Sequence, residues 1–304
     1  MQNPSTPLVK TRQGTLSGIT EQGIHLWRGI PFAAPPVGEL RWRAPQPPAR
    51  WQGVRQADTF SAASWQDIEY CRELGGGDPG RFSEDCLYLN VWAPAGRTQP
   101  LPVMVWLHGG GFTIGAGSLP PYDGKALAAR DVVVVTVNYR LGHLGFFAHP
   151  ALEGEDGERV YNFALLDQIA ALQWVQDNIH AFGGDATNVT LFGESAGARS
   201  VLSLMVSPKS RGLFHKAIIQ SGYTLPDLPR EKSAGERAFA GGTLLAAGGQ
   251  RRTAAGDSGG GVLVADRAAE YRTGADRRRC GVTAADAGGF FRRPSAPDAG
   301  HGWL

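Results

Sequence analysis

The stretch that decides the fold is NVTLFGESAGARSV, residues 188–201. Its first five residues are mostly apolar or β-branched and predict a short strand, and SAGARSVLSLMVS is typical of a helix. Between the two, Ser195 stands in the pattern Gly-x-Ser-x-Gly, whose small neighbours permit a sharp turn. Strand, tight turn and helix are the setting of a nucleophile elbow, where the helix N-terminus faces developing negative charge. We therefore predict that Ser195 is a nucleophile.

The same five-letter pattern occurs a second time, in GDSGG at residues 256–260. This motif resembles the serine motif of chymotrypsin-like proteases, but Ser258 follows QRRTAA, which does not predict a strand. No segment of the chain resembles the histidine motif of those proteases. Because a short motif needs its structural context, we interpret Ser258 as a coincidence.

The glycines of HGGGF, residues 108–112, follow the apolar run 101–107 directly. Without a Cβ, glycines let backbone N–H groups converge on one point. Acyl transfer needs such donors where a carbonyl oxygen becomes an oxyanion. We predict that Gly110 and Gly111, with the N–H group of Ala196, form an oxyanion hole; the alternative is a plain flexible loop.

Other segments of the chain predict alternating strands and helices. DVVVVTVNYR, residues 131–140, is typical of a strand buried on both faces. Residues 162–182 have apolar side chains at a spacing of three to four and predict a helix that ends at GGD. A further short strand is expected within 214–222. This alternation indicates an α/β domain with a mostly parallel central sheet.

Composition restricts the class of protein. Of the 304 residues, 42% are hydrophobic and 19% are charged, which is typical of a globular protein, and the net charge is only +2. Residues 1–240 carry no basic excess, so nucleic acid is not expected as a partner. Residues 1–18 contain no apolar signal region and no run approaches eighteen apolar residues. We therefore expect a cytoplasmic protein without a membrane segment, whose oligomeric state is left open.

Residues 241–304 differ from residues 1–240. They contain fourteen Gly, thirteen Ala and nine Arg, with no Lys and no sustained helix or strand period. We predict two parts: a folded domain over 1–240 and a tail over 241–304 that buries too little apolar surface to fold. A GC-rich gene read in the wrong frame would yield such a tail. Translation of the other two frames beyond codon 240 tests this hypothesis.

Several longer motifs then occur in order, and together they resemble the type-B carboxylesterase family, the cholinesterase-like branch of the α/β-hydrolases. The resemblance covers roughly residues 8–235 and implies an α/β-hydrolase fold that is incomplete at its C-terminal end. Besides HGGGF and the serine stretch, it is carried by GIPFAAPPVGELRWRAPQPP (29–48), EDCLYLNVWAP (84–94), NYRLGHLGFF (138–147) and SPKSRGLFHKAIIQSG (207–222).

By this resemblance the activity is hydrolysis of small-molecule carboxylic esters through an acyl-enzyme on Ser195. No cofactor and no metal ion are implied. Glu194 would line the site, although a surface carboxylate at a helix start is the simpler reading. Among the histidines before Ser195, His108 is the one expected near the site. The alternative function is that of a non-catalytic α/β-hydrolase relative that acts as a binding protein.

Cys71 and Cys86 leave two possibilities open. As residues of a cytoplasmic protein they are expected to be reduced thiols. The resemblance implies instead that they stand where family members often form a disulfide.

The general base and the acid of a catalytic triad are not assigned. In this fold the order along the chain is serine, acid, histidine, so both partners must follow Ser195. His215 lies too early for the base, and nothing around Asp298 and His301 resembles the family's motifs. We therefore predict that the triad acid and histidine are absent, and that the 304-residue chain is weakly active or inactive.

Overall fold

The computed structural model describes residues 6–149, 152 and 161–223. The predictions for residues 241–304 therefore concern residues outside the described part. The strands are β1 (Leu8–Lys10), β2 (Thr15–Ser17), β3 (Ile19–Glu21), β4 (Ile24–Pro31), β5 (Val54–Gln56), β6 (Tyr88–Pro94), β7 (Leu101–Leu107), β8 (Val133–Val137), β9 (Gly184–Glu194) and β10 (Lys216–Gln220). The helices and 3₁₀ turns are η1 (Gly38–Leu40), α1 (Ile68–Leu74), η2 (Pro120–Tyr122), α2 (Lys125–Ala128), α3 (Gly142–Phe146), α4 (Phe163–Asn178), η4 (Ile179–Phe182), α5 (Ala196–Val206) and η5 (Pro208–Ser210).

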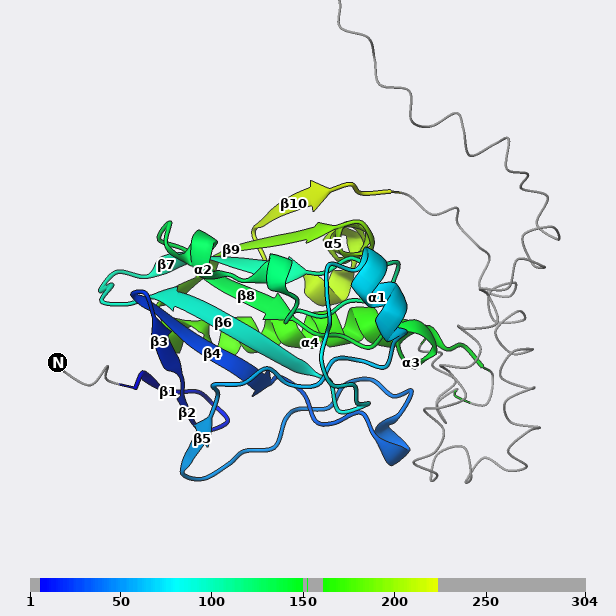
Figure 1. The fold of residues 1–304 in the computed structure, drawn as a ribbon, viewed down its shortest axis with the longest axis horizontal. Coiled ribbons are helices and arrows are strands. Elements are labelled where there is room, and N and C mark those ends of the chain that lie inside the picture. Colours follow the sequence, from blue (N-terminus) through cyan, green and yellow to red (C-terminus); the bar gives the residue numbers. More distant parts are fainter. Residues whose placement is uncertain (1–5, 150–151, 153–160, 224–304) are drawn as a thin grey trace, which may run out of the picture. The chain divides into compact units, whose positions relative to one another are not determined.

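The larger sheet has the order β10-β9-β7-β8-β6-β4-β3 among the described residues, and Figure 1 shows its strands side by side. The pairs within β10-β9-β7-β8 are parallel, whereas the pairs within β8-β6-β4-β3 are antiparallel. The expectation of a mostly parallel sheet therefore holds only for the half that carries Ser195. For the pair β3–β4 the reason is local, because a tight turn at Gln22 and Gly23 joins the two strands, and such short connections join antiparallel strands. A smaller sheet has the order β1-β2-β5.

Side chains of the central strands alternate between two faces of the sheet. Val103 and Val105 of β7 belong to the main core, together with Leu172 of α4 and Val201 of α5. On the opposite face Trp106 packs against Phe192 of β9, with ring centroids 4.8 Å apart. All five residues of β8 are buried, so the prediction of a strand buried on both faces is confirmed.

Helix α4 confirms the helix expected over 162–182, with η4 as its continuation. The chain then turns at Gly183, whose φ of 80° favours glycine. The buried face of α4 also contains polar residues, each of which has a partner. Asp167 accepts three hydrogen bonds from Arg140, and Gln168 donates to Ser200 at 3.0 Å. These contacts explain why α4 is buried around more of its circumference than its apolar pattern indicates.

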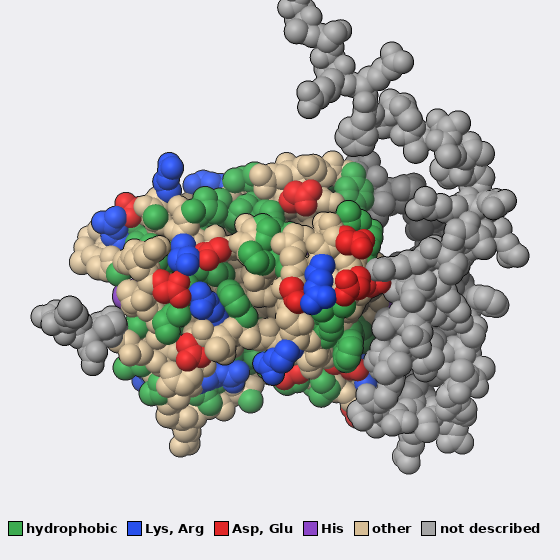
Figure 2. Space-filling model, in the orientation of Figure 1, with side chains coloured by type: hydrophobic (Ala, Val, Ile, Leu, Met, Phe, Trp, Pro, Cys, Tyr) green, Lys and Arg blue, Asp and Glu red, His purple; other side chains and the backbone are tan. Residues whose placement is uncertain are grey.

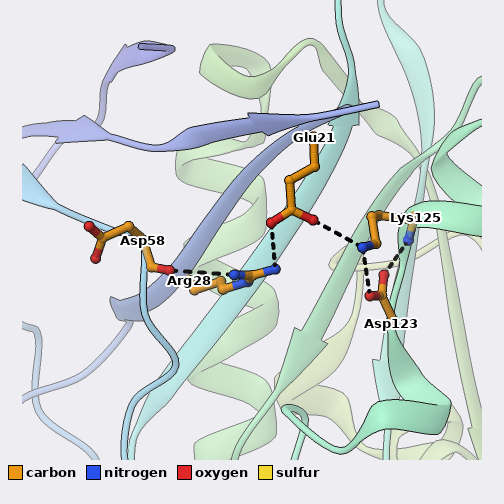
Figure 3. A network of polar contacts seen from close by, with 5 residues as sticks. All are labelled: Glu21, Arg28, Asp58, Asp123 and Lys125. Carbon is orange, nitrogen blue, oxygen red and sulfur yellow. Dashed lines mark hydrogen bonds and ion pairs between the residues drawn. The ribbon is translucent and has the colours of Figure 1, made fainter. Parts of the chain in front are cut away.

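A network of charged side chains joins the start of the sheet to α2 (Figure 3). Glu21 of β3 accepts hydrogen bonds from Arg28 of β4 at 3.4 Å and from Lys125 of α2 at 3.0 Å. Lys125 also pairs with Asp123 at 3.4 Å. The Lys125 ammonium lowers the pKa of the Glu21 carboxyl. The network thus connects β3, β4 and α2.

The face drawn in Figure 2 has basic and acidic side chains lying close together rather than in separate fields. Arg72, for example, pairs with both Glu69 and Asp78. Among the described residues, no helix has the length and apolar character needed to cross a membrane.

Candidate active site

The turn between β9 and α5 holds Ser195 in an unusual backbone conformation. Its φ is 52° and its ψ is −117°, a region that residues with a Cβ rarely adopt. The Ser195 N–H group donates to the carbonyl oxygen of Gln220 at 3.0 Å, and Arg199 N–H donates to Ser195 O at 2.9 Å. The strand, turn and helix predicted around Ser195 are therefore all present.

The glycines on either side of Ser195 allow the turn to pack tightly. A Cβ on Gly197 would lie 2.0 Å from the carbonyl oxygen of Leu107, the last residue of β7. A Cβ on Gly193 would lie 2.5 Å from the carbonyl carbon of Gly197. Both distances are far below van der Waals contact, so the Gly-x-Ser-x-Gly pattern is a requirement of close backbone packing at this point.

The glycine loop 108–112 lies against the serine turn. A Cβ on Gly109 would lie 3.3 Å from Ser195 Cβ and 2.7 Å from Glu194 Oε2. Gly110 and Gly111 have φ values of 98° and 61°, which glycine adopts without strain. Within the described part of the chain, the N–H groups of the three predicted donors give no hydrogen bond to any protein acceptor: Gly110, Gly111 and Ala196.

Hydrogen bonds fix the loop on both sides. Ile114 N–H donates to Gly110 O at 3.0 Å, which closes the loop on itself. Gly142 N–H donates to Phe112 O at 2.7 Å and ties the end of the loop to α3. The ring of Phe112 also packs edge-on against Phe146, with centroids 5.0 Å apart. The loop is consequently held in place rather than flexible.

His108 supports the loop from beneath. Its side chain is buried, and its ring stacks on Tyr139 with centroids 4.3 Å apart. The Tyr139 hydroxyl donates to the His108 carbonyl oxygen at 2.6 Å. Burial lowers the pKa of His108 to about 4, so the ring is neutral near pH 7. His108 was expected near the site. Its ring is enclosed by protein, and its contacts with Tyr139 help to position the loop.

Glu194 is the last residue of β9 and lies beside the loop. Its carboxylate is next to Gly109, because a Cβ on that glycine would lie 2.7 Å from Glu194 Oε2. Burial, and then the charge of Glu194, raise the pKa of Tyr122. Glu194 itself is half-buried.

No described side chain forms a hydrogen bond with Ser195 Oγ. His215 is tied to the middle of β9: its backbone N–H donates to Val189 O at 2.8 Å, and Val189 N–H donates to its Nδ1 at 3.2 Å. Val189 lies six residue steps before Ser195, roughly 20 Å along an extended strand, which excludes His215 as the base. Ser258, Asp298 and His301 lie outside the described residues. Among the described residues, no group of three or more metal-ligating side chains lies together.

Cys71 and Cys86, the two cysteines among the described residues, are free thiols in different hydrophobic clusters. Cys71 packs with Ile114 and Leu119, whereas Cys86 belongs to the main core. Burial raises the pKa of Cys86 to about 12, so its thiol is protonated and unreactive. The disulfide implied by the family resemblance is not formed in this structure.

Sequence reasoning missed two supports of the site, Tyr139 and Gly142. Both lie in NYRLG, which entered the sequence analysis only as part of a longer motif. The signal was available, because the segment directly follows a predicted strand. The carboxyl ends of neighbouring parallel strands meet at one edge of a sheet, so β8 places this segment beside the ends of β7 and β9.

The serine turn after β9 and the parallel strands around it are those of an α/β-hydrolase. The model of the carboxylesterase family matches residues 5–246. The chain belongs to the carboxylesterase family, which confirms the resemblance and the fold class expected from the sequence.

Individual relatives agree with this assignment. The chain is 47% identical over 233 residues to para-nitrobenzyl esterase of Bacillus subtilis (strain 168), which covers 76% of this chain and 47% of the relative. It is 49% identical over 240 residues to fumonisin B1 esterase of Sphingopyxis macrogoltabida, covering 78% of this chain and 43% of the relative. A solved PNB esterase superposes with a TM-score of 0.78 at 42% identity, over 88% of this chain and 55% of that one. The chain thus spans about half the length of these proteins.

Proposed function

We propose that this chain carries the nucleophile and oxyanion hole of a carboxylic ester hydrolase that acts on small-molecule esters. The observation that supports this most directly is the pairing of a strained Ser195 with three backbone N–H groups that have no acceptor among the described residues. A strained serine beside unpaired donors is what acyl transfer requires. The esterase names of the relatives support the same class of substrate.

In the proposed reaction Ser195 Oγ attacks the carbonyl carbon of the ester. The C=O electron pair moves to oxygen, and the N–H groups of Gly110, Gly111 and Ala196 stabilise the resulting oxyanion. The C–O bond to the alcohol then breaks, and the alcohol leaves with the proton from the serine. Water cleaves the acyl-enzyme in the same way and releases the carboxylic acid. His108, buried and neutral, holds the loop and takes no part in proton transfer.

A base is needed to carry the serine proton, and the described residues place none beside Ser195. We therefore propose that the 304-residue chain alone hydrolyses esters slowly. A triad serine without its base retains only the contribution of binding and of the oxyanion hole, roughly 10³- to 10⁴-fold over water.

The first test uses the full chain and a fluorophosphonate that reacts with activated serines. We expect slow labelling at Ser195, located by mass spectrometry, and none in Ser195→Ala. Gly110→Pro removes one donor of the oxyanion hole and should slow the labelling further. A folded chain that is not labelled would favour the non-catalytic binding protein.

The second test supplies the missing base. Residues 1–223 are joined to the part of the Bacillus subtilis para-nitrobenzyl esterase that follows the matched segment. We expect this chimera to hydrolyse p-nitrophenyl acetate, and the Ser195→Ala chimera to lose at least about 10³-fold in kcat. A folded chimera that is inactive would contradict the proposed function.

The domain boundary and the cellular location are also proposals. We propose that the domain boundary lies near residue 240, which limited proteolysis would show as a stable fragment of about that length. We also propose a cytoplasmic location, which fits the free thiols of Cys71 and Cys86. Cell fractionation tests the location.

A further inference from the structure

A cavity of about 550 Å³ lies beside the glycine loop. Phe112, at the end of the loop, forms one wall, and Phe146 and Phe147 of the α3 segment form another. Leu165 of α4 and Arg199 of α5 close the remaining sides. The lining therefore combines aromatic and aliphatic side chains with the guanidinium of Arg199 and with four other polar side chains: Thr113, His143, Asn162 and Ser203.

Two residues of this cavity lie close in the chain to the proposed reaction centre. Arg199 is four residues after Ser195 on the same helix, which places it about 6 Å further along the helix axis. Phe112 directly follows Gly111, one of the proposed oxyanion donors. A ligand whose ester carbonyl lies at Ser195 can therefore place another group in the cavity.

Among the described residues Arg199 has no counter-ion: its guanidinium forms no ion pair and no hydrogen bond with another of them. None of the described residues that line the cavity is Asp or Glu. The cavity also contains Ser203, one helical turn after Arg199, whose hydroxyl donates to Arg199 O at 3.0 Å. A half-buried guanidinium among aromatic rings is best satisfied by an anion with two acceptor oxygens, because the guanidinium fork matches a carboxylate.

We propose that this cavity is a carboxylate subsite, and that the substrates are esters that carry a carboxylate near the ester bond. The preference for carboxylate-bearing esters rests on the proposed function. Carboxylate binding at Arg199 rests on the cavity alone.

The test compares 4-phenylbutanoate with its neutral amide, 4-phenylbutanamide, by ligand-observed NMR titration of the full 304-residue chain. A charge-assisted pair predicts that the carboxylate binds about tenfold more tightly than the amide. Arg199→Met should abolish this preference, and Arg199→Lys should retain part of it because the charge remains. Arg130→Met is the matched control: Arg130 is exposed and lies before β8, at the opposite end of the parallel strands.

Equal affinity for the two compounds, binding of neither, or an unchanged preference in Arg199→Met would each overturn the carboxylate subsite. Circular dichroism of the Arg199 variants separates loss of the site from loss of the fold, and Arg199→Lys provides a second folded variant. Fluorophosphonate labelling of Ser195 is measured on the same samples. Carboxylate preference without labelling would support the subsite and contradict the ester hydrolase. Labelling without carboxylate preference would support the ester hydrolase and contradict the subsite.

Discussion

At Ser195 the backbone is held in a conformation that costs a serine of order 1–3 kcal/mol. The cost is met by the packing of its neighbours, since Gly193 and Gly197 allow β9, α5 and the end of β7 to approach without a Cβ between them. Ser195 itself is half-buried in this turn. Glycine is needed at these two positions for a steric reason, independently of any role in the reaction.

Substitution of Gly197 should therefore destabilise the whole domain. Gly197→Ala places a Cβ 2.0 Å from the carbonyl oxygen of Leu107, and the backbone on both sides must move. We expect a loss of about 3 kcal/mol in the free energy of unfolding, measured by urea denaturation. Met205→Ala, on the exposed side of the same helix, is the control and should change stability by less than about 0.5 kcal/mol. Equal stability of the two variants would refute the packing argument.

His108 should make the protein less stable in mild acid. Its folded pKa is about 4, below the value near 6.5 expected in the unfolded chain. Between these values the unfolded chain binds more protons, so the stabilisation is fully present above pH 6.5 and is lost as the pH falls toward 4. The loss attributable to His108 is about 3 kcal/mol over this range.

The measurement is urea unfolding of the wild type and of His108→Asn between pH 7.5 and pH 4.5. The variant should lose less stability over this range than the wild type. Burial also lowers the pKa of His25, but this contribution is the same in both proteins and cancels in the comparison. Parallel pH profiles for the two proteins would rule out His108 as the source.

At the scale of elements, a buried ion pair fixes the segment after β8 to α4. Arg140 donates to both carboxylate oxygens of Asp167, from Nε at 2.8 Å and from Nη2 at 2.7 Å, and both side chains are buried. The same segment carries Tyr139 and Gly142, which support the glycine loop. The position of the loop therefore depends on α4 as well.

Removal of one partner of this pair leaves a buried, unpaired charge. Arg140→Met should cost about 3–5 kcal/mol in the free energy of unfolding, because the Asp167 carboxylate keeps its burial and loses its counter-ion. Arg97→Met is the matched control, because Arg97 pairs with Asp131 at the surface with about half of each side chain exposed, and its loss should cost at most about 1 kcal/mol. Thermal unfolding of the two variants side by side measures the difference, and similar melting temperatures would contradict it.

At the scale of the whole molecule, the described sheet ends at an apolar edge. Within the described residues β10 pairs only with β9, and Ile218 and Ile219 are 43% and 40% exposed. Parallel strands are normally covered on both faces, and an unprotected apolar edge invites pairing with another chain.

We therefore expect the 304-residue chain to self-associate as its concentration rises, as measured by light scattering. Ile219→Lys places a charge on the edge strand and should reduce the association. Leu74→Lys changes an equally apolar and more exposed residue at the end of α1, away from the sheet edge, and should leave the association unchanged. A chain that stays monomeric at every concentration would contradict the expectation.

The strands and helices around Ser195 could be predicted from the sequence because each has a strong local pattern. The apolar runs that became β7 and β8, and the periodic stretch that became α4, are long enough to be recognised on their own. The strands β1, β2, β3 and β5 have three residues each and no period to recognise. Of these only β3 joins the larger sheet, antiparallel to β4, whereas β1, β2 and β5 form the smaller sheet. The larger sheet is more mixed than expected because β4, β6 and β8 also pair antiparallel.

The candidate site likewise has features with a local sequence signal and features that depend on contacts between distant segments. Ser195 and the glycine loop carry local signals, and the sequence predicted both. The stack of Tyr139 on His108 and the bond from Gly142 to Phe112 join segments about thirty residues apart. Such contacts exist only because β7 and β8 are neighbours in the sheet, and no pattern within either segment specifies the partner.

The hydrogen bond from Ser195 N–H to Gln220 O makes the proposed nucleophile dependent on an edge strand. Ser195 follows β9, which has neighbours on both sides, but its amide is held by the last residue of β10. Each time the outer strand frays, the Ser195 amide loses its acceptor and becomes exchangeable with deuterium. The amide of the reactive residue should therefore exchange at the rate of an edge strand, faster than the amides of β9 that precede it.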